Sequence, residues 1–240
     1  MHPNQLFIEK SEKILRTRPK GCCYLLYLDI TDFQYINFCY GTEAGDRLLQ
    51  AVNDYTAGLP FVLLCERLYS DYFLCILYFP GETPDEKAVQ AVEHSLNGFM
   101  AEQQKLYPAC KLRFACGLCR TGTQELSHTI ESANLARKEA KRLDTGSAVL
   151  YSEELVQKTV TRYELEQTLN QAVREQRFCF YLQPKVDLTN GRIIGAEALA
   201  RRIGQDGTVI YPDSFLPVME SSGTVVELDL LICKIGRAHV

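Results

Sequence analysis

Residues 22–33 read CCYLLYLDITDF, and this stretch decides how the first part of the chain folds. Its run of Cys, Tyr and Leu is apolar on both faces of an extended chain and carries no charge before Asp29. Strands of this kind lie in the middle of a sheet that helices cover on both sides. We therefore predict a buried strand that ends at Asp29, where a carboxylate is well placed to hold a metal ion on phosphate groups.

A second stretch, residues 61–79, reads FVLLCERLYSDYFLCILYF and holds two apolar runs on either side of a polar step at Asp71. The pattern predicts a β-hairpin with Asp71 at its tip. A hairpin packed beside the first strand would bring Asp71 close to Asp29. Two carboxylates that meet in this way form a hard oxygen site suited to Mg²⁺.

Both acids also have purely structural explanations. An aspartate at the end of a strand is often the N-cap of the next helix, and Thr31 or Asp32 offers that helix the same capping group. An aspartate at a hairpin tip, such as Asp71, is often only a turn residue. The residue types by themselves leave the metal-binding and structural interpretations of Asp29 and Asp71 open.

The rest of residues 1–151 alternates between helical and extended patterns, which predicts an α/β sheet with helices on both faces. The predicted helices cover residues 5–15, 43–57, 85–105 and 127–143, and two further strands cover residues 111–120 and 148–151. The expected core contacts of the first helix are Leu6, Ile8, Ile14 and Leu15.

The last predicted helix of this region ends in a basic run, RKEAKR, at residues 137–142. Three of its cations are Lys138, Lys141 and Arg142. A charge run on a helix is most simply a solvated face. From the residues alone we therefore expect these side chains to point to solvent.

Two blocks of this region, taken together, resemble a known family. Residues 28–49 read LDITDFQYINFCYGTEAGDRLL, and residues 67–73 read RLYSDYF. Over residues 4–151 the chain resembles the GGDEF domain of diguanylate cyclases, whose signature LDxDxFKxINDxxGHxxGDxxL precedes a hairpin that carries GGDEF. The resemblance implies a GGDEF-type sheet with flanking helices.

The resemblance also implies roles for individual residues. Asp29 and Asp71 correspond to metal ligands, so that Mg²⁺ or Mn²⁺ is the implied cofactor. Asn37 and Asp46 correspond to the pair that reads the guanine of GTP, and Lys141 corresponds to a phosphate contact.

Several positions depart from the family pattern. Tyr69 and Ser70 replace the two glycines of the hairpin, Tyr72 replaces its glutamate, and Thr31 replaces the second acid of the strand block. The glycines allow the backbone to approach the nucleotide closely, whereas Tyr69 places a phenol ring in that space. The Arg-x-x-Asp of the family's product-inhibition site would fall at residues 60–63 and is missing. We therefore expect a degenerate domain that binds GTP but does not synthesise cyclic di-GMP.

Residues 152–177 predict one long helix with few turn residues, and Ser152 is a suitable start signal. Such a helix can link two domains stiffly. It can equally be the first helix of the domain that follows.

A second family resemblance begins at residue 178. Residues 178–202 read FCFYLQPKVDLTNGRIIGAEALARR, in which Asn190 and Gly191 predict a hairpin between two antiparallel strands. The block GTVIYPDSFLPVMESSGTVVELD follows at residues 207–229. Over residues 178–231 the chain resembles the EAL domain of cyclic di-GMP phosphodiesterases, which is a (β/α) barrel.

This second resemblance implies that Glu197 is a catalytic residue and metal ligand. It also implies that Gln183, Leu199 and Arg201 line the pocket for cyclic di-GMP.

The predicted organisation is a degenerate GGDEF domain at residues 1–151, a linker helix at 152–177 and an incomplete EAL barrel at 178–234. A closed eight-stranded barrel takes roughly 240 residues, so the chain is expected to be a fragment of a longer protein. Residues 235–240, IGRAHV, interrupt the helical pattern and are interpreted as a non-native tail.

Composition limits the classes of partner and location. The formal net charge is −4 with a pI near 5.7, so there is no basic stripe of the kind that nucleic acid requires. The start of the chain resembles neither a signal peptide nor a membrane span, and with ten cysteines this favours a reducing cytoplasm and free thiols. Cys116 and Cys119 are three apart on a predicted strand, which places them on opposite faces and argues against a shared zinc ion.

The leading functional prediction is a regulatory GTP-binding domain fused to a cyclic di-GMP phosphodiesterase, with a homodimer left open. By itself, this chain is expected to be inactive. The alternative is a catalytically inactive interaction module that senses nucleotides. An active diguanylate cyclase is the least favoured hypothesis.

Overall fold

The computed structural model describes residues 3–81, 83–122 and 124–237, and the chain forms two compact units, Met1–Glu153 and Glu154–Val240. Each unit has a hydrophobic core of its own. No helix within the described ranges is long and apolar enough to cross a bilayer.

Within the described residues, the sheet of the N-terminal unit has five strands in the order β2-β3-β1-β4-β5. β1 (Cys23–Thr31) lies in the centre and pairs antiparallel with β3 (Tyr72–Tyr78) and β4 (Arg113–Arg120). The outer strands are β2 (Val62–Tyr69), antiparallel to β3, and β5 (Ala148–Leu150), parallel to β4. The predicted α/β architecture with a central first strand is therefore present.

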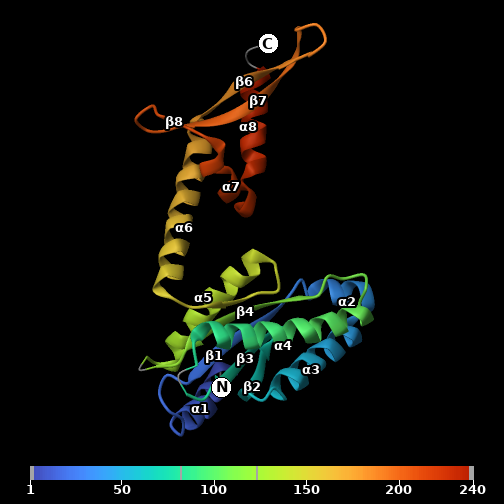
Figure 1. Ribbon diagram of the computed structural model, residues 1–240, viewed down its shortest axis with the longest axis vertical. Coiled ribbons are helices and arrows are strands. Elements are labelled where there is room, and N and C mark those ends of the chain that lie inside the picture. Colours follow the sequence, from blue (N-terminus) through green and yellow to red (C-terminus); the bar gives the residue numbers. More distant parts are fainter. Residues whose placement is uncertain (1–2, 82, 123, 238–240) are drawn as a thin grey trace. The chain divides into compact units, whose positions relative to one another are not determined.

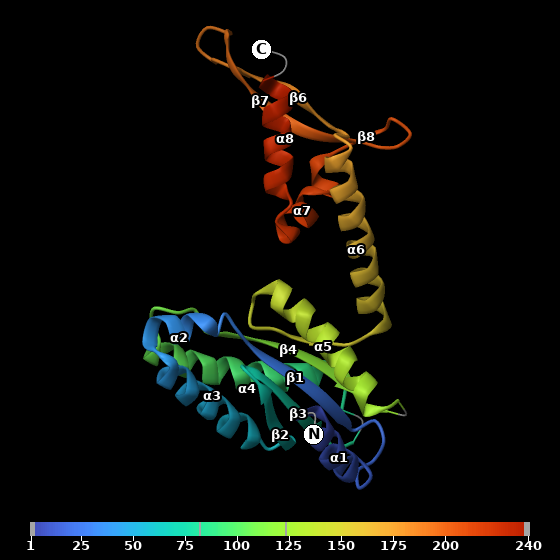
Figure 2. The same ribbon diagram turned by 180° about the vertical axis from the view of Figure 1, so that it is seen from behind.

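β1 is buried along its whole length because helices cover both faces of the sheet (Figures 1 and 2). On one face α3 (Thr42–Ala57) and α4 (Asp85–Leu106) pack against the sheet, and the short helix α2 (Gln34–Tyr40) connects β1 to α3. On the other face lie α1 (Pro3–Leu15) and α5 (Leu126–Leu143).

The end of β1 differs from the prediction. The strand continues past Asp29 because Ile30 and Thr31 still pair with Phe114 and Arg113 of β4, whereas pairing with β3 stops at Asp29. Asp29 is therefore an internal residue of the strand and is fully buried.

The buried face of α1 also differs in part. Ile8, Ile14 and Leu15 pack against the core as expected, but Leu6 is 45% exposed and Phe7 is fully buried instead. Phe7 and the buried Ser11 lie four residues apart and so share one face of the helix, from which Leu6 is offset by one position.

The predicted hairpin of β2 and β3 is confirmed, with Tyr69 paired to Tyr72. Ser70 and Asp71 form the turn, and Ser70 adopts a left-handed φ of 50°. Arg67 Nε donates a hydrogen bond of 2.7 Å to the carbonyl of Ser70 and so holds the turn. The tip has the backbone geometry that favours glycine, but here it carries a serine.

The C-terminal unit contains α6 (Glu153–Arg174) and, among the described residues, an antiparallel sheet of three strands. Leu169 and Ala172 of α6 lie in the core of this unit. The second half of α6 thus behaves as the first helix of the following domain, which is one of the two alternatives that the sequence left open. The remaining elements are β6 (Phe178–Val186), β7 (Ile193–Ile203), β8 (Val209–Ile210), η1 (Pro212–Ser214), α7 (Leu216–Ser222) and α8 (Val225–Arg237).

Two details of this unit correct the prediction. The connection between β6 and β7 is longer than a two-residue turn, and the Asp187 carboxylate holds it by accepting bonds from Thr189 N (2.8 Å) and Asn190 Nδ2 (2.7 Å). The helical pattern is not interrupted at Ile235, because α8 continues to Arg237 and Ile235 packs against the core. Residues 238–240 of the expected tail lie outside the described residues.

Candidate functional site

The candidate site of the N-terminal unit is built where α5 crosses β1 and β4. Gly117 of β4 lies beside Tyr27 of β1, and a Cβ atom at Gly117 would be 1.9 Å from the Ala133 carbonyl oxygen and 2.2 Å from the Arg137 nitrogen. The absence of a side chain therefore lets the helix backbone approach the sheet closely. This approach carries Arg137 and Lys141, one turn apart, over Asp29.

Asp29 is held by two cations from α5. Its Oδ2 accepts a hydrogen bond from Arg137 Nη1 and another, of 2.9 Å, from Lys141 Nζ. The Arg137 side chain is 7% exposed, whereas that of Lys141 is 41% exposed. A buried carboxylate needs such pairing because desolvation of an isolated charge is costly.

The structure corrects the prediction that the basic run of α5 is only a solvated face. Lys141 reaches Asp29, while Lys138 is exposed and Arg142 pairs with Glu139 on the surface. Arg137 is not among the site residues that the sequence predicts. A signal for it existed, since it lies among the buried small residues of α5, which mark the face toward the sheet: Ala133, Ala136 and Ala140.

Aromatic rings fix the Arg137 guanidinium. Its central carbon lies 5.4 Å from the centre of the Tyr27 ring and 5.1 Å from that of the Tyr72 ring. Arg137 Nε also donates a hydrogen bond of 2.9 Å to Asn134 Oδ1. Rings facing a guanidinium attract its charge, so Arg137 is oriented by contacts with β1, β3 and its own helix.

Asp71 lies close to Asp29, as the hairpin predicted. Burial raises the pKa of the Asp71 carboxyl above its ordinary value, and the negative charge of Asp29 raises this pKa further. A hydrogen bond of 2.7 Å from Ser70 Oγ acts in the opposite direction and lowers the pKa. Oδ1 of Asp29 is buried and accepts no hydrogen bond from the part of the chain that the structure describes.

Of the two structural explanations for these acids, the turn is present and the helix cap is not. Asp71 is indeed a turn residue. Neither Thr31 nor Asp32 caps the next helix, because α2 has Phe33 at its N-cap position and no side-chain capping bond. Asp29 is bound to α5 instead.

A cavity of about 320 Å³ opens at this site. It brings together Asn37, Asp71 and Lys141, three of the residues that the sequence singled out. Asn37 is packed against Gly45, where a Cβ atom would lie 2.0 Å from Asn37 Oδ1. Asp46 does not line the cavity and is exposed on α3. The full lining is Asp32, Phe33, Gln34, Asn37, Ser70, Asp71, Tyr72 and Lys141.

The C-terminal unit gathers its predicted residues along one face of the β6–β7 ladder. Gln183 pairs with Glu197, Tyr181 with Leu199 and Cys179 with Arg201. Because these pairs alternate along the strands, their side chains lie on the same face. All four predicted residues of this site, Gln183, Glu197, Leu199 and Arg201, are therefore neighbours.

Two cations of this face have different surroundings. Lys185 Nζ lies 3.6 Å from Glu197 Oε2, and both side chains are more than half exposed. Arg201 is buried, with its guanidinium carbon 5.3 Å from the centre of the Tyr181 ring and 4.7 Å from that of Tyr211. Lys185 is not among the site residues that the sequence predicts.

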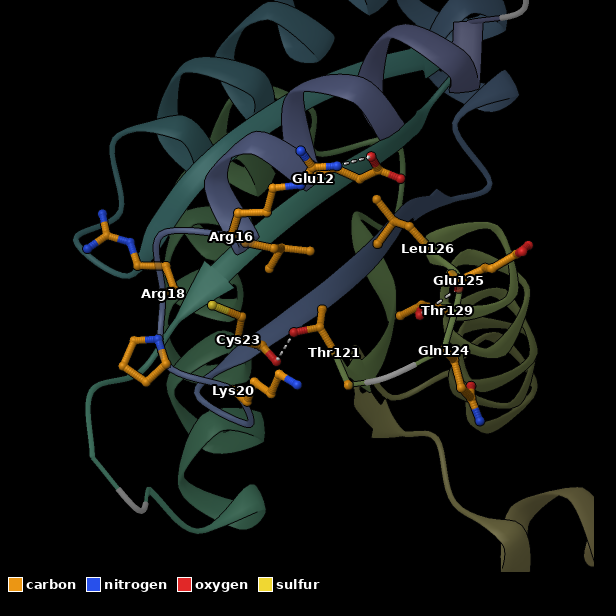
Figure 3. Close-up of a pocket in the computed structure, with 13 residues that line it drawn as sticks. Glu12, Arg16, Arg18, Lys20, Cys23, Thr121, Gln124, Glu125, Leu126 and Thr129 are labelled. Carbon is orange, nitrogen blue, oxygen red and sulfur yellow. Dashed lines mark hydrogen bonds and ion pairs between the residues drawn. The ribbon is translucent and has the colours of Figure 1, made fainter.

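A separate hollow of about 290 Å³ lies at the other end of β1, beside Cys23 and Thr121 (Figure 3). Its rim carries Arg16, Arg18 and Lys20, and Thr121 N and Oγ1 both donate to the Cys23 carbonyl. None of the predicted site residues lines it.

Among the described residues, neither the cysteines nor any group of metal-ligating side chains forms a further candidate metal site. Cys116 and Cys119 lie in the cores on opposite faces of the sheet, as predicted. Within residues 3–81, 83–122 and 124–237, no group of three or more His, Cys, Asp or Glu side chains is placed to hold a metal ion.

Comparisons with known proteins match both units. The family model described as "Diguanylate cyclase, GGDEF domain" matches residues 3–146, which is more than half of the chain. The model described as "EAL domain" matches residues 166–237.

Curated relatives match over most of the chain. It is 27% identical over 221 residues to "Signaling protein YkoW" of Bacillus subtilis, covering 89% of this chain and 27% of that protein. It is 26% identical over 234 residues to "Cyclic di-GMP phosphodiesterase NbdA" of Pseudomonas aeruginosa, covering 94% of this chain and 29% of that protein. The chain thus spans little more than a quarter of these relatives.

Among solved structures, the S helix-GGDEF-EAL region of LapD from Vibrio cholerae, bound to c-di-GMP, aligns with a TM-score of 0.48 and 14% identity. The alignment covers 98% of this chain and 54% of that chain.

Proposed function

We propose, on the premise that the chain belongs to the GGDEF domain family and continues into an EAL domain, that its N-terminal unit is a regulatory domain that binds GTP without condensing it. The two domains together make the chain a member of the GGDEF–EAL proteins of cyclic di-GMP signalling. The EAL unit is proposed to belong to the phosphodiesterase of that protein.

The observation that carries the proposal is the buried ion pair of Asp29 and Arg137. Cyclase chemistry joins two GTP molecules by attack of a 3′-hydroxyl on an α-phosphorus, and it depends on charge stabilisation at fixed positions. Tyr72 stands where the motif has an acid, and its ring packs against Arg137 instead. The groups needed for turnover are replaced, while Asn37 and Lys141 still line the cavity.

The residues that remain suit a bound nucleotide. The ammonium group of Lys141, at the cavity wall and partly exposed, is proposed to contact phosphate oxygen atoms. The Asn37 amide, packed against Gly45, is proposed to donate and accept hydrogen bonds at the guanine edge. The Asp46 carboxylate, which follows Gly45 in the sequence, is proposed to accept hydrogen bonds from the same base. Tyr69 is 58% exposed at the hairpin tip and would restrict how deeply the nucleotide enters.

In the EAL unit, Glu197 is proposed to be the catalytic carboxylate, with Gln183, Leu199 and Arg201 beside the nucleotide. Glu197 and Gln183 present exposed oxygen atoms on one face, which fits the hard ligands that Mg²⁺ or Mn²⁺ prefers. A divalent cation held there would polarise the phosphodiester and activate water. Lys185 beside Glu197 would help to orient this carboxylate.

The test measures synthesis and binding separately on the whole chain. With GTP and Mg²⁺ we expect no cyclic di-GMP by chromatography, but a rise in the melting temperature of the N-terminal unit, because GTP binds the folded state. Asn37→Ala should remove most of that rise. Asn53→Ala, the same substitution on the surface of α3, should leave it unchanged.

Two results would contradict the proposal. Synthesis at a rate comparable with that of a cyclase with an intact motif would show an active enzyme. No thermal shift at millimolar GTP would show that the pocket does not bind the nucleotide.

A further inference from the structure

We propose that the guanidinium of Arg137 occupies the place of a divalent cation at Asp29, so that the N-terminal site binds nucleotide without a metal ion of its own. This inference deepens the proposed GTP-binding function and rests on it for the nucleotide. Its first part, the exclusion of metal, is independent of GTP.

The charge of Asp29 is already neutralised from inside the protein. Arg137 Nη1 and Lys141 Nζ both donate to the same oxygen, Oδ2, and Asp29 has no exposed surface. An arginine side chain stays charged at any pH at which the protein is folded. The Arg137 charge is therefore always present at the site, where it takes the part that the charge of a bound metal ion would play.

Arg137 is fixed in this position from several sides. The rings of Tyr27 and Tyr72 lie 5.4 Å and 5.1 Å from its central carbon, and Asn134 accepts from its Nε. Gly117 places the helix backbone close enough for the contact to form. In any other position, the guanidinium would lose its contacts with the two rings, the amide and the carboxylate.

The residues present do not fit a divalent cation at Asp29. Magnesium and manganese take several oxygen ligands and retain water molecules, so their ligands need open space. Here the carboxylate is buried beneath Arg137, which would have to leave and would then be a buried charge without a counter-ion. The acidic side chains that line the cavity are Asp32 and Asp71. Within the described residues, these acids do not form a group of three or more metal-ligating side chains that is placed to hold an ion.

The same arrangement gives Lys141 its role. Because Arg137 alone can neutralise Asp29, the partly exposed ammonium of Lys141 is available to phosphate oxygen atoms at the cavity. The expected ligand is a nucleoside triphosphate whose charge is met by Lys141 and by whatever cation the nucleotide carries itself. Metal in solution then affects the nucleotide and not the protein site.

The first experiment titrates the full chain with Mn²⁺ alone and follows free Mn²⁺ by electron paramagnetic resonance. All proteins carry Glu197→Gln, which removes the carboxylate of the EAL unit. We expect no Asp29-dependent Mn²⁺ binding in this background. After Arg137→Gln, we expect an Asp29-dependent site that binds Mn²⁺ at least tenfold more tightly than the parent chain does. Adding Asp29→Asn should remove the new site, and Arg142→Gln, a surface control on the same helix, should create none.

Arg137→Met serves as a second variant of similar length, and circular dichroism checks that each variant is folded. Tight Mn²⁺ binding by the Glu197→Gln chain that is lost on adding Asp29→Asn would overturn the proposal, and this result needs no Arg137 variant. Failure of both folded Arg137 variants to gain a site would overturn it as well.

The second experiment measures GTP affinity in EDTA and in Mg²⁺ by thermal shift. We expect the two affinities of the original chain to agree within about threefold, and the affinity of Arg137→Gln to fall at least tenfold in EDTA and recover with Mg²⁺. A strict metal requirement in the original chain would contradict the proposal. No GTP binding under either condition, with the Mn²⁺ results as expected, would refute the GTP-binding function but leave the replacement of metal by Arg137 in place.

Discussion

The two units present the same kind of side chain in opposite settings. Asp29 and Glu197 are both carboxylates that the sequence indicated as metal ligands, but Asp29 is fully buried and the Glu197 side chain is 55% exposed. Asp29 is bound by two cations of one helix, whereas Glu197 has Lys185 at 3.6 Å across a strand pair. The comparison teaches that burial and the cation beside it, more than the acid itself, decide what a carboxylate is available to do.

Removing the buried cation should have the largest effect. Arg137→Met leaves Asp29 buried without its main counter-ion, and breaking such a pair typically costs about 3–5 kcal/mol. Urea unfolding of the N-terminal unit, followed by tyrosine fluorescence, measures the loss. Added Mn²⁺ should restore part of the stability, since the vacated carboxylate can then bind it. A loss below about 1 kcal/mol would mean that Asp29 is not isolated from solvent and that the contrast with Glu197 is false.

Disturbing the contact that positions Arg137 should come second. Gly117→Ala places a Cβ atom 1.9 Å from the Ala133 carbonyl, so α5 must move away, at about 1–3 kcal/mol for an overpacked site. Gly98→Ala in α4, where no atom lies within 4 Å, should be neutral or stabilising by up to about 1 kcal/mol. Equal effects of the two substitutions in urea unfolding would show that the close approach of α5 does not hold the site together.

The neighbouring acid should show a smaller, pH-dependent effect. Burial and the charge of Asp29 raise the pKa of Asp71, so the folded state holds this proton more tightly than the unfolded state. The associated stability is present below the ordinary carboxyl pKa and is lost as pH rises through the raised pKa. Asp71→Asn removes the charge and should therefore stabilise the N-terminal unit at pH 7, and by less at pH 4.

Unfolding midpoints of wild type and Asp71→Asn across this range test the prediction. The same substitution at exposed Asp46 is the control for removing one negative charge from the surface of the same unit. A difference at Asp71 that falls as pH rises would contradict the placement of Asp71 beside Asp29.

Removing the exposed cation should have the smallest effect. Lys185→Met breaks a pair in which both side chains are more than half exposed, and such pairs contribute at most about 0.5–1 kcal/mol. Salt should reduce even this difference, because exposed charges are screened. A loss as large as that of Arg137→Met in the unfolding of the C-terminal unit would mean that Glu197 depends on its cation as Asp29 does.

Periodicity in the sequence was sufficient for much of the fold. The apolar run of β1 and the turn at Ser70 and Asp71 follow from strand patterns that act over short distances. In the C-terminal unit the two-residue period of β6 and β7 was enough to place Gln183 and Glu197 on one face. Local backbone geometry determines these relations, so a single sequence can predict them.

The failures concern faces and contacts between distant segments. Phe7 and not Leu6 enters the core, because the direction of a helix face depends on the surface it packs against. Arg137 looked like part of a solvated charge run for the same reason. Only the packing of α5 over Gly117 shows that this cation points inward.

The sequence by itself determined the family of both units, the central strand and the identity of the acids at each site. Tertiary structure alone decided that Asp29 is neutralised by Arg137 and Lys141 while Glu197 stays open to solvent. The physical reason is that the free energy of a charge depends on its burial and on groups within a few ångströms, and segments 108 positions apart in the chain supply those groups here.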